Sequence, residues 1–223
     1  MHFTPQELWA ATGTPVRLVL VILMLMAVWC LYVAIERTLM LGKARKQSRA
    51  LAEAVAGPLS NSDAKAALEV CGQESYAASY LGHMLSAGLT EFTGRSDKYG
   101  IEAAERALDR VSITEAQSLK KGMNILATTG STAPFVGLVG TIFGIINAFQ
   151  MMGEAGGGDL GAISSGIAEA LITTALGIAV AIIGVWLFNY FNGKIDEITD
   201  DMSVSVQELL DWCEKQVLPP VGE

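Results

Sequence analysis

Three long apolar runs constrain the fold of this chain more than any other feature of its sequence. Residues 18–35 and 125–152 contain no Asp, Glu, Lys or Arg, and residues 163–191 contain only Glu169. About 20 apolar residues in a helix cross the hydrocarbon core of a bilayer, and a helix satisfies its own backbone hydrogen bonds there. Hydrophobic residues make up 51% of the 223 residues and charged residues only 17%. We therefore expect an all-α, polytopic membrane protein with three transmembrane helices and long cytoplasmic helical extensions.

The distribution of Lys and Arg predicts how these helices are oriented. Eleven of the 15 basic residues lie between Lys43 and Lys121, and none lies in the loop 153–162. Cytoplasmic loops carry the excess of Lys and Arg, so we expect the N-terminus and this loop outside and the C-terminus in the cytoplasm. The expected segments are an outer N-terminal segment (1–17), a first span (18–37), a cytoplasmic helical domain (38–122), a second span (123–152), a short outer loop (153–162), a third span (163–191) and a cytoplasmic C-terminal helix (192–223).

Charge, cysteine and histidine content argue against several other classes of function. The formal net charge is −8 and the chain has no basic stripe, so we expect no nucleic-acid binding. Cys30, Cys71 and Cys213 show no CxxC spacing, and His2 and His83 have no partner at ligand spacing. We therefore expect no disulfide, no metal site and no cofactor. No nucleophile, base and orienting group converge in the sequence, so we do not expect an enzyme.

The segment 39–122 is rich in Ala, Leu, Glu, Lys and Arg, which predicts helices. From about Ser96 the apolar residues keep helical spacing without a breaker until Gly122, so we expect a long helix that continues into the second span. Turn-forming residues predict breaks between the helices at Gly57-Pro58, 60–63 and 94–97.

The second and third runs contain small residues at helical spacing, whereas the first consists mainly of Leu, Val, Ile and Met. Lipid gives helices no hydrophobic reason to associate, so seams of small residues mark close helix contacts. We therefore expect the second and third helices to pack tightly against other helices and the first to face lipid. The expected packing residues are Gly130, Pro134, Gly137 and Gly144 in the second run and Gly166, Ala170 and Gly177 in the third.

Glu169 is the residue of the third run that most needs an explanation. A charged side chain at the centre of a bilayer costs roughly 2.5 to 3.5 kcal/mol on insertion scales, so a bundle interior or a water-filled path has to shelter it. Threonine hydroxyls can bond to carbonyls of their own helix, but a carboxyl cannot be satisfied in this way. Helix geometry puts Thr173 on the same face as Glu169 and Thr174 about 140° away. We interpret Glu169 as part of an ion or proton pathway, with Thr173 as the nearer partner.

Two stretches carry a resemblance to a known family. They are ILATTGSTAPFVGLVGTIFGIINAF at 125–149 and SGIAEALITTALGIAVAI at 165–182. With IER at 35–37 and KGMNILAT at 121–128, they resemble the core helices of the ExbB, TolQ and MotA superfamily of ion-driven stator proteins. The resemblance is greatest to the ExbB and TolQ branch, whose GIAEAL motif reads here as residues 166–171.

The resemblance implies a stator of the bacterial inner membrane, with the N-terminus in the periplasm. Family members form a homo-oligomeric ring, typically a pentamer, around the single-span helices of a dimeric partner of the ExbD or TolR type. Proton flow past an aspartate on that partner converts the proton motive force into mechanical work at the cell envelope. The cytoplasmic helices would extend beyond the bilayer and offer a docking surface for a further envelope or cytoplasmic effector.

The family's pore-lining positions correspond to Thr141, Glu169 and Thr174, and Thr173 stays a candidate on spacing. Ser165 and Ile183-Gly184 stand where the family often has Pro, which leaves open a relative that powers gliding motility or another envelope machine. An alternative of a different class is a non-conducting membrane scaffold in which Glu169 is structural. Sodium stays an alternative to the proton.

Overall fold

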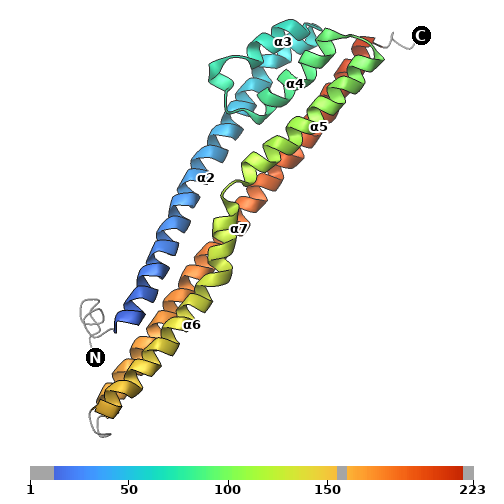
Figure 1. Ribbon diagram of the computed structural model, residues 1–223. Coiled ribbons are helices and arrows are strands. Elements are labelled where there is room, and N and C mark those ends of the chain that lie inside the picture. Colours follow the sequence, from blue (N-terminus) through green and yellow to red (C-terminus); the bar gives the residue numbers. More distant parts are fainter. Residues whose placement is uncertain (1–12, 155–159, 218–223) are drawn as a thin grey trace. The chain divides into compact units, whose positions relative to one another are not determined.

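The computed structural model describes residues 13–154 and 160–217 (Figure 1). The expected segments 1–17, 153–162 and 192–223 each lie partly outside these described residues. Every regular element within the described ranges is helical: α2 (Thr14–Ser60), α3 (Ala64–Cys71), the short 3-10 helix η1 (Glu74–Tyr76), α4 (Tyr80–Gly94), α5 (Lys98–Lys120), α6 (Met123–Glu154) and α7 (Leu160–Val217).

The chain divides into two compact units, which are described separately. The first, here called the span unit, consists of Met1–Ile35 and Gly122–Tyr190. The second, the polar unit, consists of Glu36–Lys121 and Phe191–Glu223. Among the described residues, three helices are long and apolar enough to cross a membrane: α2, α6 and α7. This agrees with the three transmembrane helices expected from the sequence.

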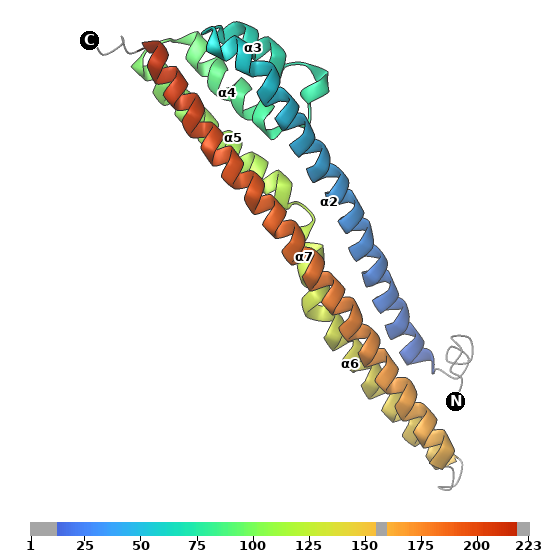
Figure 2. The same cartoon turned by 180° about the vertical axis from the view of Figure 1, so that it is seen from behind.

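In the span unit α6 and α7 lie side by side and run in opposite directions (Figures 1 and 2). A small apolar core joins them to the first part of α2. Val19 and Leu23 of α2 are buried there with Ala133 of α6 and Ala181 of α7. Two of the four core residues are alanines. Because their side chains are small, the helix backbones can approach closely.

Many large apolar side chains of the span unit are exposed on a single chain. Met24 of α2 is 65% exposed, Phe135 of α6 68% and Trp186 of α7 70%. Soluble monomers rarely expose contiguous apolar surface of this extent. A bilayer or other protein chains must therefore cover this surface.

The polar unit has a core of larger side chains. Leu51 of α2, Leu89 of α4, Leu108 of α5 and Ile195 of α7 are each fully buried. Figure 2 shows α3 and α4 beside the C-terminal part of α2. A leucine or isoleucine buried in this way contributes roughly 1.5–3 kcal/mol relative to an exposed one. This unit is therefore organised like the core of a water-soluble helical domain.

Short polar side chains fix where three helices of the polar unit begin. Asp63 accepts a hydrogen bond from the amide of Ala66 at the start of α3. Two further caps have the same geometry, in which the side chain accepts from the amide three residues on and satisfies one free donor of the first turn. They are Ser79 with Gly82 at α4 and Asp97 with Gly100 at α5.

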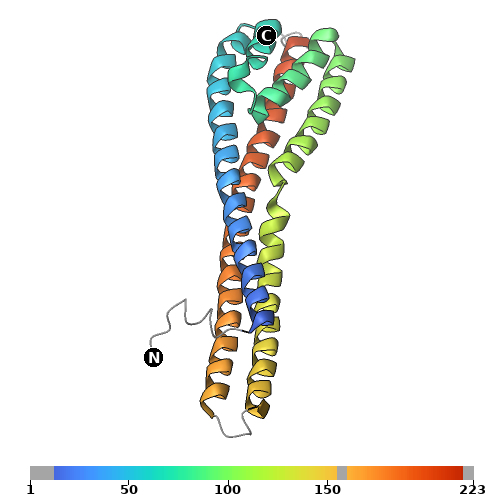
Figure 3. The same cartoon turned by 60° about the vertical axis from the view of Figure 1, so that its left-hand side comes forward.

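The expected continuous helix from about Ser96 into the second span is wrong. Helix α5 ends at Lys120, and α6 begins at Met123. Between them Lys121 is extended, with ψ of 133°, and Gly122 has φ of 82°. Glycine adopts this left-handed conformation without steric cost, and it commonly ends helices in this way. The interruption is visible in Figure 3.

The expected break at Gly57-Pro58 is also wrong. Helix α2 includes Pro58 and ends at Ser60, because a proline near the C-terminus removes only one backbone donor from the ladder. The indole Nε1 of Trp212 donates to the carbonyl of Leu59 at 2.9 Å. This carbonyl, one of the last of the helix, also accepts from the amide of Ser62 at 3.1 Å. The expected breaks at 60–63 and 94–97 do separate α2 from α3 and α4 from α5.

Candidate functional site

The backbones of α6 and α7 touch at the middle of the span unit. A Cβ added at Gly137 would lie 2.9 Å from the carbonyl oxygen of Thr173 and 3.2 Å from the Cα of Gly177. A Cβ added at Gly177 would lie 2.7 Å from the carbonyl oxygen of Ala133. Real Cβ atoms do not approach backbone atoms this closely, so only glycine fits at both positions without a shift of the helices.

The other glycines of the two predicted seams lie along the same contact. A Cβ at each would come within 2.6–2.8 Å of a side chain on the opposite helix: Gly144 faces Ala170, Gly166 faces Ala148, and Gly130 faces Val185. Pro134 lies inside α6 and is half-buried. Its ring removes the amide donor for the carbonyl of Gly130. The contact therefore extends over about five turns of α6, from Gly130 to Ala148.

Two glycines of this contact were missed by the sequence analysis. A Cβ at Gly140 would meet Thr173 Oγ1 at 2.6 Å and Val19 Cγ1 at 3.0 Å, so Gly140 lies where all three helices meet. A Cβ at Gly184 would lie 2.9 Å from the amide nitrogen of Gly130. Gly140 has helical spacing from Gly137, but the sequence does not show its contact with Val19 of a third helix. In the sequence Gly184 stands out only because the family often has Pro there. In the structure its lack of a side chain lets α7 approach the backbone of α6.

The three candidate threonines lie at the α6–α7 contact but bond differently. Thr173 is 1% exposed, and its hydroxyl donates to Ala170 O of its own helix at 2.7 Å. Thr141 likewise donates to Leu138 O at 2.6 Å. The Thr174 hydroxyl points to α6, with Gly137 O at 3.1 Å and Thr141 Oγ1 at 3.5 Å, and Gly137 O also lies 3.4 Å from the Thr173 hydroxyl. The structure therefore brings Thr141 and Thr174 together across the two helices.

Glu169 lies one turn from these threonines on α7, directly before Ala170 of the contact. The side chain is half-buried, and Oε1 is fully buried without a hydrogen-bond partner among the residues that the structure describes. A buried polar atom with no partner costs about 1–3 kcal/mol, and more if it is charged. The described residues of the span unit therefore leave Oε1 of Glu169 without a hydrogen bond. A donor from another molecule would remove this energetic penalty.

A carboxyl with neighbouring hydroxyls can take up and pass on a proton, or supply oxygen ligands to a cation. Hydroxyls donate and accept at once, whereas an ionised carboxyl only accepts. None of the three threonine hydroxyls bonds to Glu169. The described residues of one chain therefore include groups that could form a proton relay, but these groups are not joined by hydrogen bonds.

The polar unit contains a buried cation whose environment the sequence does not reveal. Arg37 is 3% exposed. Its Nη2 donates to the Glu36 carboxylate at 2.9 Å, and its Nη1 approaches Leu119 O in the last turn of α5 at 3.4 Å. A cation is favourable beside the free carbonyls that end a helix. Arg37 therefore ties α2 to the end of α5, just before the interruption at Gly122.

The histidine and two cysteines of the polar unit are held in ordinary packing or hydrogen-bonding environments. His83, which looks isolated in the sequence, has its Nδ1 2.8 Å from Glu115 Oε1. Burial raises the pKa of the Cys213 thiol to about 11 and also raises that of Cys71, so both stay protonated and weakly nucleophilic at neutral pH. Within 13–154 and 160–217, no three His, Cys, Asp or Glu side chains are grouped so as to hold a metal ion.

Together these features define a class of protein. The protein is an integral membrane protein whose second and third spanning helices form a tightly packed pair that carries a partly buried carboxyl. Residues 77–204 match the family model described as the MotA/TolQ/ExbB proton channel family. The chain belongs to this family.

Individual relatives agree with this assignment. Biopolymer transport protein ExbB of Neisseria meningitidis serogroup B is 30% identical over 210 residues, which cover 89% of this chain and 92% of that protein. ExbB of Xanthomonas campestris pv. campestris is 38% identical over 125 residues, 56% of this chain and 47% of that protein. The Tol-Pal system protein TolQ of Pseudomonas aeruginosa is 39% identical over 115 residues, 48% and 49% of the two chains. The chain thus spans about half the length of the Xanthomonas and Pseudomonas relatives.

Proposed function

We propose that this chain is the stator subunit of a proton-driven motor in the bacterial inner membrane. With a single-span partner of the ExbD or TolR type, it converts the proton motive force into mechanical work that energises transport across the cell envelope or other processes there. The N-terminus lies in the periplasm and the C-terminus in the cytoplasm. The chain itself performs no covalent chemistry.

One observation carries the proposal: Glu169 has a buried oxygen without a partner among the described residues, and no other Asp, Glu, Lys or Arg lies in residues 163–191. Intramembrane carboxyls are rare and face a bundle interior or a water-filled cavity. Glu169 directly precedes Ala170 of the α6–α7 contact, and the Thr141 and Thr174 hydroxyls lie 3.5 Å from each other at the same contact. A preorganised carboxyl with nearby hydroxyls suits a proton path, and the family match supports the same reading.

The outward surface of α6 and α7 supports a ring of several copies. Phe135, Ile142 and Phe149 recur at seven-residue intervals on α6 and are 68%, 51% and 56% exposed. Leu171 and Ile178 do the same on α7, at 62% and 46%. Three helices from one chain cannot enclose a pore lined by two of them, so neighbouring copies complete it. The partner helices then occupy the centre, where an aspartate of the partner carries the proton.

Within this proposal the threonines have unequal parts. Thr174 and Thr141 form a hydroxyl pair across α6 and α7, and we assign them to the lining of the path. The Thr173 hydroxyl lies 2.7 Å from Ala170 O of its own helix and 3.4 Å from Gly137 O of α6, and the residue is almost fully buried, so we give it the smaller part, in helix packing.

The test is Glu169→Gln expressed with the partner protein in cells whose own stator genes are deleted. The proposal predicts a full-sized assembly with no work driven by the proton motive force, because glutamine cannot exchange a proton. Glu197→Gln is the matched control, since Glu197 lies on the same helix, is 48% exposed and pairs with Lys194; it should keep wild-type activity.

Glu169→Ala distinguishes the non-conducting scaffold. If Glu169 only locks helix packing, alanine weakens assembly in proportion to any loss of activity, and variants that assemble normally work normally. If the proposal is right, activity disappears while assembly, measured by cross-linking in the membrane, is retained. Wild-type activity in an intact Glu169→Ala assembly would rule out the proton-path role.

A further inference from the structure

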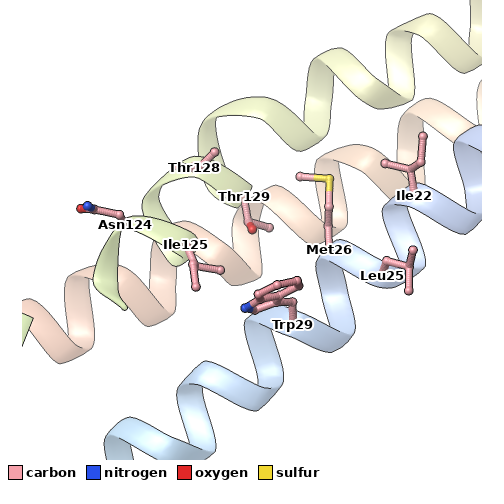
Figure 4. Close-up of a pocket in the computed structure, with 8 residues that line it drawn as sticks. All are labelled: Ile22, Leu25, Met26, Trp29, Asn124, Ile125, Thr128 and Thr129. Carbon is pink, nitrogen blue, oxygen red and sulfur yellow. The ribbon is translucent and has the colours of Figure 1, made fainter. Parts of the chain in front are cut away.

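A groove of about 450 Å³ lies between α2 and α6 in the span unit, away from the α6–α7 contact. Ile22, Leu25, Met26 and Trp29 of α2 form one wall, and Asn124, Ile125, Thr128 and Thr129 of α6 form the other (Figure 4). Leu25 and Trp29 are 61% and 58% exposed, so the groove is open along one side. Both walls belong to candidate spanning helices.

The lining of the groove changes in polarity along its length. Ile22 and Leu25 at one end are aliphatic and belong to the interior of the apolar run 18–35. Asn124, at the other end, directly precedes the apolar run 125–152, and Trp29 lies towards that end (Figure 4). Tryptophan is enriched where hydrocarbon meets the polar headgroups. The groove therefore runs from the membrane border into the hydrocarbon.

Two polar groups of the lining have no partner among the described residues. Thr129 is 4% exposed, and its hydroxyl faces the groove. Neither this hydroxyl nor the indole N–H of Trp29 has a hydrogen-bond partner in the described part of the chain. Trp29 is 58% exposed and the Thr129 hydroxyl opens onto the groove, so both groups can bond to a molecule that lies there. An occupant of the groove should therefore be apolar over most of its length and bring a hydrogen-bond acceptor at one end.

We infer that this groove binds one acyl chain of a membrane phospholipid, with an ester carbonyl accepting from Trp29 or Thr129. The chain lies against Ile22, Leu25 and Met26. A helix of a neighbouring subunit fits the groove less well, because a helix with its side chains is about 10–12 Å across, whereas the groove has a volume of about 450 Å³. The ester carbonyls of a phospholipid are free acceptors at this depth. The inference is independent of proton conduction.

Phosphatidylcholine with brominated acyl chains tests the inference, because bromine quenches tryptophan fluorescence on contact. The full chain, purified in detergent as its native assembly, is titrated at low ratios of lipid to protein. We expect a saturable loss of fluorescence that disappears in Trp29→Phe and persists in Trp186→Phe. Trp186 is the matched control because it is 70% exposed on α7 and lies outside the groove.

Two further variants keep Trp29 as the reporter. Thr128→Phe places an aromatic ring in the groove and should abolish the saturable quenching. Thr129→Val removes one hydroxyl with little change in shape. It should raise the lipid-to-protein ratio at half-saturation by about two- to tenfold, the range for a lost hydrogen bond. Helicity and oligomer size serve as folding controls.

Equal quenching of Trp29 and Trp186 at every lipid ratio would overturn the inference, because it would indicate only the general lipid annulus. Trp29 that stays unquenched while Trp186 is quenched would also overturn it, since protein would then cover the groove. If Thr128→Phe does not fold, an unchanged lipid titration in Thr129→Val together with equal quenching in the two tryptophan variants gives the same negative answer.

Discussion

The two units of this protein use glycine and leucine in opposite ways. In the span unit a Cβ at Gly137 would collide with backbone atoms of α7 at 2.9–3.2 Å. In the polar unit a Cβ at Gly88 would meet the side-chain ends of Leu209 and Leu108. At Gly137 glycine thus brings two backbones into contact, while at Gly88 it makes room for large side chains.

The difference follows from what surrounds each unit. Burying a large apolar side chain away from water contributes about 25 cal/mol per Å², so the polar unit gains from its leucine core. Lipid is as apolar as leucine, so helices there associate through close van der Waals packing and interhelical hydrogen bonds. The Thr174 bond to Gly137 O is one of these bonds. This contrast predicts which substitutions harm each unit.

The largest loss of stability is expected from truncation in the polar unit. Leu89→Ala removes a fully buried side chain from α4 and should lower the free energy of unfolding by about 2–5 kcal/mol, because it leaves a cavity. Val204→Ala on α7, where Val204 is 55% exposed, is the control and should change little. Hydrogen exchange of the α4 and α5 amides in the detergent-solubilised chain measures both. Equal protection in the two variants would show that this core does not hold the unit together.

Enlargement, not truncation, should harm the span unit. Gly177→Ala brings a Cβ within 2.7 Å of Ala133 O and should cost about 1–3 kcal/mol, as for other overpacked sites. Gly193→Ala, on the same helix with open space around it, should be neutral or stabilising by up to about 1 kcal/mol, because alanine is the better helix former. Melting temperatures in detergent compare the two. Equal melting of Gly177→Ala and Gly193→Ala would mean that α6 and α7 are not in backbone contact.

A smaller effect is expected at the start of α5. Partial burial tends to raise the pKa of Asp97, but hydrogen bonds from Arg95 Nε and the Gly100 amide, with the Arg95 charge, lower it below its usual 3.8. A carboxyl with a lowered pKa stabilises the folded state above pH 3.8, and this contribution fades as the pH falls through the folded-state value. Asp97→Asn keeps a capping oxygen but cannot titrate.

Hydrogen exchange of the α5 amides checks this over about pH 2 to 5, the range around a carboxyl pKa. The protection in wild type relative to Asp97→Asn should fall as the pH drops below 3.8. A difference that stays constant with pH would show that the Asp97 charge has no part in capping α5.

The three spanning helices were predictable because run length and the absence of charge decide them almost alone. The small-residue seams predicted close packing of the second and third spans, since close approach in lipid requires glycine or alanine, but they did not predict that the two seams meet each other. The interruption at Gly122 was not predictable in this way. A glycine at the end of a helical pattern can continue the helix or end it. Only the structure, with a φ of 82° at Gly122, shows that the helix ends here.

Interactions between distant parts of the chain account for the other differences. Spacing along α7 put Thr173 on the same face as Glu169, but it could not show that the hydroxyls of both Thr173 and Thr174 approach Gly137 O of α6, at 3.4 Å and 3.1 Å. The ties between His83 and Glu115, and between Arg37 and Leu119 O, join residues 32 and 82 positions apart. No local pattern records such pairs.

Proton flux into liposomes that contain the chain and its partner tests the central claim most directly. The vesicles enclose a pH-sensitive dye, and an imposed pH gradient drives the flux. The account predicts that wild type and Glu197→Gln acidify the interior at the same rate, and that Glu169→Gln falls to the rate of empty vesicles. Flux through an intact Glu169→Gln assembly at the wild-type rate would contradict it.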